Sequence, residues 1–201
     1  MANNYLDQAR EAYKNEDYEK AQTYYALAYE ADPEDAEARY FAAYLNVANA
    51  SAVVMYDKTC AYVDTVKVLL KGLSGEEKDA IIAIIIKTAG TITQYVHKVM
   101  WEHSKEIKAS QELLNKYNKE RNACEKACIE MLYLVGDTAA ESEDEDTKKL
   151  SADAWKSAIA AQQLYPYCRA EKTLPATYAE KVKAIDPNYE LPKKAGCISF
   201  S

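Results

Sequence analysis

The sequence predicts an all-α protein, in which a short helical hairpin packs on a larger helical bundle and about seven to eight helices make up the whole. Three observations support this fold class. The chain of 201 residues has only five glycines and five prolines, so few positions interrupt a helix. Apolar residues recur three or four positions apart along most of its length, which is the spacing of one helix face. Near the N-terminus, alanines and tyrosines recur together at this spacing, which lets two helices pack closely.

Four helices are expected in the first part of the chain. Residues 15–17 form a polar turn between the first two helices. Asp32-Pro33 combines an N-cap residue with a proline at the first helical position, which predicts the start of the third. Lys71 and Gly72 are residue types common at a helix C-terminus and predict the end of the fourth. The expected helices cover residues 4–15, 18–31, 33–48 and 54–72.

A long apolar rhythm follows, from Ile81 to Val135, and Gly90 is the only glycine or proline within it. One very long helix would account for this rhythm, and so would two antiparallel helices with a turn near residues 104–110. Helices of globular proteins rarely exceed about 25 residues, which favours two helices.

The acidic run 141–146 contains no apolar residue and is expected to be a solvated linker or loop. Beyond it, Ser151 is a candidate N-cap for a further helix. The predicted division has a helical hairpin with a capping helix (1–50), a long-helix bundle (51–139), an acidic linker or loop (140–149), and a C-terminal helical hairpin with an irregular tail (150–201).

The N-terminal segment resembles a tetratricopeptide repeat (TPR), a helix–turn–helix unit of 34 residues, when Pro33 is placed at the usual proline of the repeat. Aromatic and small residues then fall at signature positions of the family: Tyr5, Ala9, Tyr18, Ala21, Tyr25 and Ala28. Two positions depart from the pattern, Gln8 where a leucine is usual and Ala12 where an aromatic is usual. The resemblance covers one repeat and the helix after it, about a quarter of the chain, and implies a TPR-like hairpin that packs on other helices to bury its own face.

In that family, the first helix of each repeat lines a concave groove that binds peptides. The resemblance therefore implies a binding surface on the first and third helices, lined by Asn3, Leu6, Arg10, Tyr13, Glu37, Tyr40 and Tyr44. Tyrosine and arginine are frequent hot-spot residues of protein interfaces. Leu6 stands where some members have the lysine of a carboxylate clamp, which argues against that specialised activity. An alternative stays open for Tyr40 and Tyr44, because both would also be accommodated by packing on the fourth helix.

Composition argues against several classes of partner and location. The net charge of −7 and the pI near 5.0 argue against nucleic-acid binding, which requires clustered positive charge. The most apolar run, residues 80–86, is shorter than the roughly 20 residues of a membrane span, and the N-terminus does not read as a secretory signal. Five cysteines without framework spacing indicate free thiols. We therefore expect a cytoplasmic protein that binds neither nucleic acid nor a membrane.

No cluster of residues argues strongly for catalysis. Cys124 and Cys128 lie one helical turn apart, and His97 or His103 could complete a zinc site across a hairpin. Both cysteines fall on the apolar face, however, where cysteine behaves as a small hydrophobic residue. The sequence has no glycine-rich phosphate loop, no calcium-binding loop and no nucleophile beside a histidine. We therefore expect no enzyme activity, no cofactor and no metal.

The function that we expect from the sequence is that of an adaptor or scaffold, with a protein or peptide partner bound in the TPR-like groove. An alternative is a helical sensor or regulator that binds an apolar ligand, or forms a homodimer, through the bundle from Ile81 to Val135. This alternative rests on five isoleucines between residues 81 and 86, which are apolar on all sides of a helix and must be covered.

Overall fold

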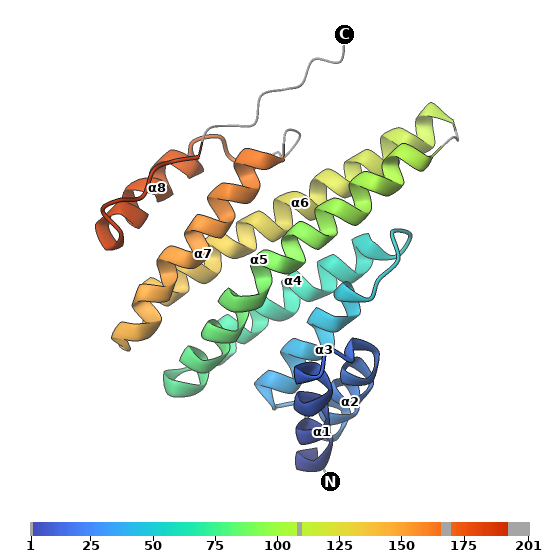
Figure 1. Cartoon of the computed structure of the whole chain (residues 1–201), viewed down its shortest axis with the longest axis vertical. Coiled ribbons are helices and arrows are strands. Elements are labelled where there is room, and N and C mark those ends of the chain that lie inside the picture. Colours follow the sequence, from blue (N-terminus) through green and yellow to red (C-terminus); the bar gives the residue numbers. More distant parts are fainter. Residues whose placement is uncertain (1, 108–109, 166–169, 193–201) are drawn as a thin grey trace. The chain divides into compact units, whose positions relative to one another are not determined.

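A computed structural model describes residues 2–107, 110–165 and 170–192. Within these residues the protein is all-α: 82% of them lie in eight helices, and the described residues contain no strand (Figure 1). The predicted irregular tail from residue 193 onward lies outside the described residues. The helices are α1 (Ala2–Lys14), α2 (Tyr18–Ala31), α3 (Ala36–Ala48), α4 (Met55–Gly72), α5 (Gly75–Glu106), α6 (Gln111–Ala140), α7 (Glu145–Leu164) and α8 (Leu174–Ile185).

The chain divides into two compact units, an N-terminal unit of Met1–Ile81 and a C-terminal unit of Ile82–Ser201. The division falls within α5. At both places where we predicted a boundary, near residue 50 and at 140–149, the flanking helices pack on one another: α3 on α4, and α6 on α7. A short polar segment joins two packed helices as readily as it joins two domains, so its composition alone does not mark a domain boundary.

Close contact between α1 and α2 defines the N-terminal hairpin. Ala9 and Ala21 are fully buried, and Ala28 is 3% exposed, because methyl groups at these positions let the two helices approach. Glu16 adopts a left-handed conformation (φ 60°) after α1. The backbone N–H groups of Glu16 and Asp17 then donate to the carbonyls of Tyr13 and Ala12, a Schellman arrangement that ends the helix.

The start of α3 differs from the prediction. Asp35, not Asp32, is its N-cap, since the Asp35 carboxylate accepts the backbone N–H of Ala38 at 2.7 Å. Asp32 instead ends α2, where its N–H donates to the carbonyl of Ala28. Its carboxylate accepts the N–H of Glu34, which forms a local turn between the two helices.

In the C-terminal unit, the long apolar rhythm resolves into two helices, since α5 ends at Glu106 and α6 begins at Gln111. The pairs His97–Glu125 and Ser104–Arg121 show that the two helices run antiparallel (Figure 1). The two-helix interpretation is therefore confirmed.

The helix α7 packs on α6 and on α8, and it begins earlier than we predicted. Asp144 is its N-cap, and the Asp144 carboxylate accepts the backbone N–H of Thr147 at 2.7 Å. Ser151, the predicted cap, is buried inside the helix, where its hydroxyl donates to the carbonyl of Lys148. The last acidic residues of the run 141–146 thus form the first turn of α7, where negative charge is favoured by the helix dipole.

By length and composition alone, α5 is long and apolar enough to cross a membrane, which differs from the expectation based on the short apolar run 80–86. A core helix of a folded unit meets the same two criteria. Ile82, Ile85 and Ile92 on α5 are at most 1% exposed in the structure. Of the isoleucines that must be covered, Ile81, Ile82 and Ile85 are buried and the remaining two are half-buried.

Candidate functional site

The predicted groove residues occupy different environments. Leu6 is 9% exposed, and Tyr40 and Tyr44 are 0% and 7% exposed. The hydroxyls of Tyr40 and Tyr62 lie 3.1 Å apart, and the rings of Tyr40 and Tyr44 both pack near that of Tyr62 on α4. The two tyrosines therefore line the contact between α3 and α4, the alternative left open by the sequence, and not an accessible groove. The side chain of Asn3 lies outside the described part of the chain.

Arg10 and Glu37 join α1 to α3 through a two-pronged ion pair. Arg10 Nε donates to Glu37 Oε1 at 2.8 Å, and Arg10 Nη2 donates to Oε2 at 2.6 Å. The hydroxyl of Tyr25 on α2 donates to the same carboxylate at 3.2 Å. The hydrogen bonds to Glu37 raise the pKa of Arg10, and burial raises the pKa of Tyr25. This cluster ties three helices together, so the charge of Arg10 is already engaged within the unit.

Tyr13 is half-buried beside this ion pair. Its ring lies 5.6 Å from that of Tyr18 and 4.9 Å from that of Phe41, measured between centroids. Burial raises the pKa of its hydroxyl. Of the predicted residues, the structure thus brings Arg10, Tyr13 and Glu37 together at a partly accessible surface between α1 and α3.

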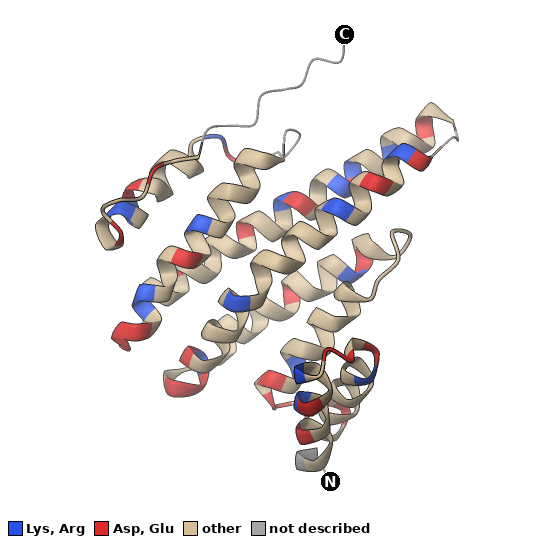
Figure 2. Cartoon of the chain, viewed as in Figure 1, with Lys and Arg blue, Asp and Glu red and all other residues tan. Residues whose placement is uncertain are grey.

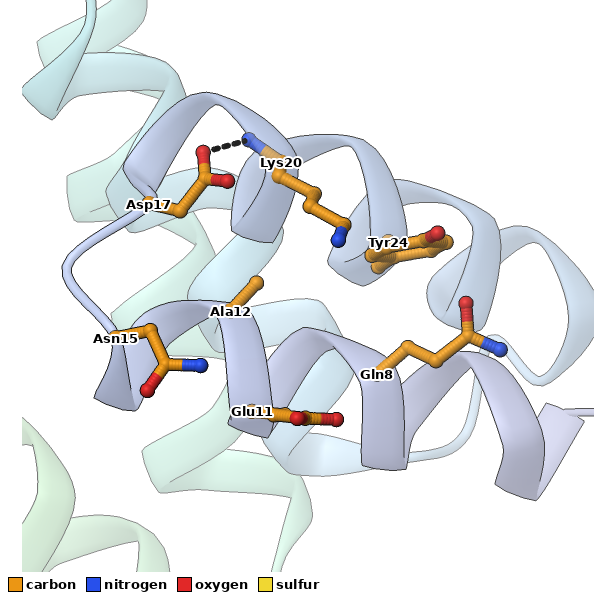
Figure 3. Close-up of a pocket in the computed structure, with 7 residues that line it drawn as sticks. All are labelled: Gln8, Glu11, Ala12, Asn15, Asp17, Lys20 and Tyr24. Atoms are coloured by element: carbon orange, nitrogen blue, oxygen red, sulfur yellow. Dashed lines mark hydrogen bonds between the residues drawn. The ribbon is translucent and has the colours of Figure 1, made fainter.

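A hollow lies on another side of α1, between α1 and α2 (Figure 3). It has a volume of about 130 Å³, and we call it the hairpin hollow; its lining residues are Gln8, Glu11, Ala12, Asn15, Asp17, Lys20 and Tyr24. Gln8 and Ala12 are the two positions at which the chain departs from the TPR pattern. Ala12 is smaller than the aromatic residue that the resemblance would place there, and Gln8 adds a polar group to the lining of the hollow.

Sequence reasoning noted both departures but did not place them in one cavity. Their spacing of four residues puts them on the same face of α1, one turn apart, and this was the available signal. The residues of α2 that complete the hollow were missed. Their contribution depends on how the turn at 15–17 folds back, which the spacing along α1 does not specify.

The surroundings of the hairpin hollow are acidic. Residues 1–37 contain ten aspartates and glutamates against three lysines and arginines, so this segment carries a net charge of −7, equal to that of the whole chain (Figure 2). Asp17 is the N-cap of α2 and accepts the backbone N–H of Lys20 at 3.2 Å. Lys20 Nζ points over the ring of Tyr24, 5.9 Å from its centroid (Figure 3). Carboxylates of Glu11 and Asp17 line the remaining rim.

A second cavity of the N-terminal unit, of about 390 Å³, lies between α2, α3 and α4. Its charged residues have mixed signs, and its lining residues are Ala26, Tyr29, Glu30, Arg39, Ala42, Ala43, Asn46, Lys58, Ala61, Tyr62 and Thr65. The charge of this cavity therefore does not select a partner of one sign.

Each histidine considered for zinc lies beside a carboxylate, and the two cysteines considered for zinc lie in the interior of the unit. His97 Nδ1 lies 2.7 Å from Glu125 Oε1, His103 lies beside Glu106, and Cys124 and Cys128 are buried. In the described ranges, histidine, cysteine and acidic side chains form no group of three or more suited to a metal ion.

No protein-family model, no curated protein and no solved structure matches this chain. The similarity to tetratricopeptide repeats therefore rests on the residues of the N-terminal hairpin and on the buried alanines that separate its helices.

Proposed function

We propose that this protein is a non-enzymatic adaptor whose TPR-like N-terminal unit binds a basic segment of a partner protein at the hairpin hollow. The observation that carries the proposal is the coincidence of two features on one hairpin. The hollow lies where TPR proteins place their own aromatic side chain, and the surrounding segment holds a net charge of −7.

The volume of the hollow suits one side chain of a partner. An apolar cavity of about 150 Å³ in another protein accepts a benzene molecule, and the hairpin hollow measures about 130 Å³. The methyl group of Ala12 and the ring of Tyr24 provide apolar contact for an inserted aromatic or aliphatic group. Its mixed rim also suits the long alkyl part of a basic side chain.

The negative charge around the hollow favours a positively charged partner. The carboxylates of Glu11 and Asp17 attract lysine and arginine residues that flank the inserted side chain. The summed field of the acidic segment increases the rate of encounter with a positively charged chain, and salt weakens this effect. Lys20 also lines the hollow and offsets one of these carboxylates, so the attraction rests on the net charge of −7 that residues 1–37 carry as a whole.

The proposal is tested by selecting binders from a random peptide library displayed on phage, with the full chain as the target. We expect the selected peptides to carry net positive charge together with an aromatic or aliphatic residue. Their binding to the full chain is then measured for Ala12→Tyr, which fills the hollow with the type of residue that the TPR family has at this position. The matched control is Ala43→Tyr, the same substitution in the second cavity.

We expect Ala12→Tyr to abolish binding and Ala43→Tyr to preserve it, with both variants retaining the helical circular dichroism of the parent. Raising the salt concentration should weaken binding to the parent chain. Selected peptides without net positive charge, or binding that survives Ala12→Tyr, would overturn the proposal. Loss of binding in Ala43→Tyr alone would transfer the site to the second cavity.

A further inference from the structure

The C-terminal unit contains a larger cavity near the closed end of the α5–α6 hairpin. It has a volume of about 440 Å³, within the range of small-molecule sites, roughly 300–1,000 Å³. The lining includes Trp101, Ser104 and Lys105 of α5 and Leu114, Asn118 and Arg121 of α6. Because residues from two antiparallel helices meet here, this cavity could not be recognised from either segment alone.

Arg121 is an unusual residue for the interior of a helical unit. Its side chain is only 5% exposed, and that of Glu125, one turn further along α6, is 2% exposed. Glu125 Oε1 lies 3.7 Å from Arg121 Nε and 2.7 Å from His97 Nδ1. The buried Glu125 carboxylate thus forms an ion pair with Arg121. Nη1 donates at 3.3 Å to the hydroxyl of Ser104 and Nη2 donates at 3.4 Å to Oδ1 of Asn122, and both acceptors line the cavity. A buried charge is tolerated when such partners are present.

Two cations lie over one aromatic ring in the wall of the cavity. The guanidinium carbon of Arg121 lies 4.7 Å from the ring centroid of Trp101, and Lys105 Nζ lies 5.5 Å from it. Both charged side chains among the described lining residues are therefore positive, and no described lining residue carries a carboxylate. Asn118 and Ser104 add neutral hydrogen-bonding groups, and Leu114 adds an apolar wall.

We infer that this cavity binds a small organic anion, in which a planar or apolar body carries one carboxylate, sulfonate or phosphate group. Arg121 and Lys105 contact the anionic group, since a guanidinium forms strong charge-assisted hydrogen bonds to such oxygens. Trp101 and Leu114 contact the body. This site is separate from the hairpin hollow. Its ligand carries a charge, whereas the sensor alternative in the sequence analysis assumed an apolar ligand.

The inference is tested with a matched pair of fluorescent probes, 1-anilinonaphthalene-8-sulfonate and N-phenyl-1-naphthylamine, which share the same rings but differ in the sulfonate. We expect the sulfonate probe to bind the full chain saturably with one molecule per chain, and the neutral probe to bind at least about tenfold more weakly, because it lacks the charge-assisted hydrogen bonds that the sulfonate accepts.

Three variants locate the bound probe. Arg121→Gln should weaken binding of the sulfonate probe about tenfold or more, and Lys105→Gln, at an exposed position, about two- to fivefold. The matched control Lys126→Gln removes the same charge from a lysine of α6 that pairs with Glu130 outside the cavity, and it should leave binding unchanged.

Circular dichroism shows whether each variant keeps its helices and therefore which comparison of variants is valid. If Arg121→Gln loses helical signal because Glu125 is left buried, Lys105→Gln compared with Lys126→Gln is decisive. Equal binding of the two probes, equal affinity of Lys105→Gln and Lys126→Gln, or the absence of saturable binding would each overturn the inference.

Discussion

Gly136 on α6 is a position where one added methyl group should destabilise the C-terminal unit. A Cβ atom built there would lie 2.4 Å from both Cδ1 and Nε1 of Trp155 on α7. Favourable contacts between carbon atoms lie at about 3.5–4.0 Å, so the indole would have to move by more than about 1 Å. Trp155 is only 4% exposed, and its rigid ring has little room to move. The sequence does not reveal this contact. It shows a glycine within a helix, which is ordinarily unfavourable, but it does not show that Trp155 lies opposite.

The expected magnitude combines two opposing effects. Replacing glycine by alanine inside a helix stabilises by about 1 kcal/mol, because alanine loses less backbone entropy. Overpacking a dense core costs about 1–3 kcal/mol, and occasionally more. A separation as short as 2.4 Å places Gly136→Ala at the upper end of this cost. We therefore expect a net loss of about 1–2 kcal/mol in the free energy of unfolding.

Gly90 supplies the matched control. It also lies inside a long helix, but a Cβ atom there would meet only the side chain of Ser157 on α7, at 3.4 Å from Oγ and 3.7 Å from Cβ. These are ordinary contact distances, so Gly90→Ala should stabilise the unit by about 0.5–1 kcal/mol. Helix propensity is common to both substitutions, and the difference between them, about 1.5–3 kcal/mol, isolates the steric cost at Trp155.

Urea denaturation followed by tryptophan fluorescence measures this difference in the right part of the molecule, because the chain's two tryptophans, Trp101 and Trp155, both lie in the C-terminal unit. In a Trp155→Leu background the penalty of Gly136→Ala should disappear, since the shorter side chain leaves space for the methyl group. The reasoning is refuted if Gly136→Ala proves as stable as Gly90→Ala, or if its penalty persists without the indole.

Two further predictions concern the ion pair of the N-terminal hairpin and a buried tyrosine. In a double-mutant cycle of Arg10→Ala and Glu37→Gln, the free energy of unfolding should show a coupling of about 0.5–1 kcal/mol that decreases in high salt, because Arg10 is half-exposed; a coupling of zero at low salt would contradict the two-pronged geometry. Burial raises the pKa of Tyr117 to about 12, whereas in the unfolded chain it is about 10. The folded state therefore retains the proton longer, and this contribution to stability is fully present below about pH 10 and is lost as the pH rises to about 12. Helical circular dichroism and tyrosinate absorbance, recorded together, should fall and rise in that window, and Tyr117→Phe should shift the loss of helix to higher pH; an unchanged midpoint in Tyr117→Phe would count against this assignment.

Local sequence signals predicted most of the fold. The spacing of Ala9, Ala21 and Ala28 predicted a closely packed hairpin, and the structure buries all three methyl groups. Helix ends were predicted less well where two candidate caps compete. Asp32 and Asp35 are both suitable N-caps, and only the hydrogen bond to the N–H of Ala38 shows that Asp35 caps α3. Helix assignment depends on residues within a few positions, whereas the choice between adjacent caps depends on how the connection packs.

Local signals predicted less of the candidate sites. The pattern identified Tyr40 and Tyr44 as large residues on one face of a helix, but it did not specify that α4 would cover that face. The pattern identified Gln8 and Ala12 as unusual. The hairpin hollow forms only because α2 folds back alongside α1 and completes the lining.

The sequence by itself determined that this chain is all-α, where most of its helices lie, and that its net negative charge resides in the first 37 residues. Tertiary structure alone decided which helical faces are covered and which residues meet. It placed Trp101 and Lys105 beside Arg121 across the α5–α6 hairpin, and Gly136 against Trp155 across α6 and α7. The physical reason is that periodicity and capping are interactions along one helix, whereas a cavity is defined by the distance between two helices, to which residues far apart in the sequence contribute together.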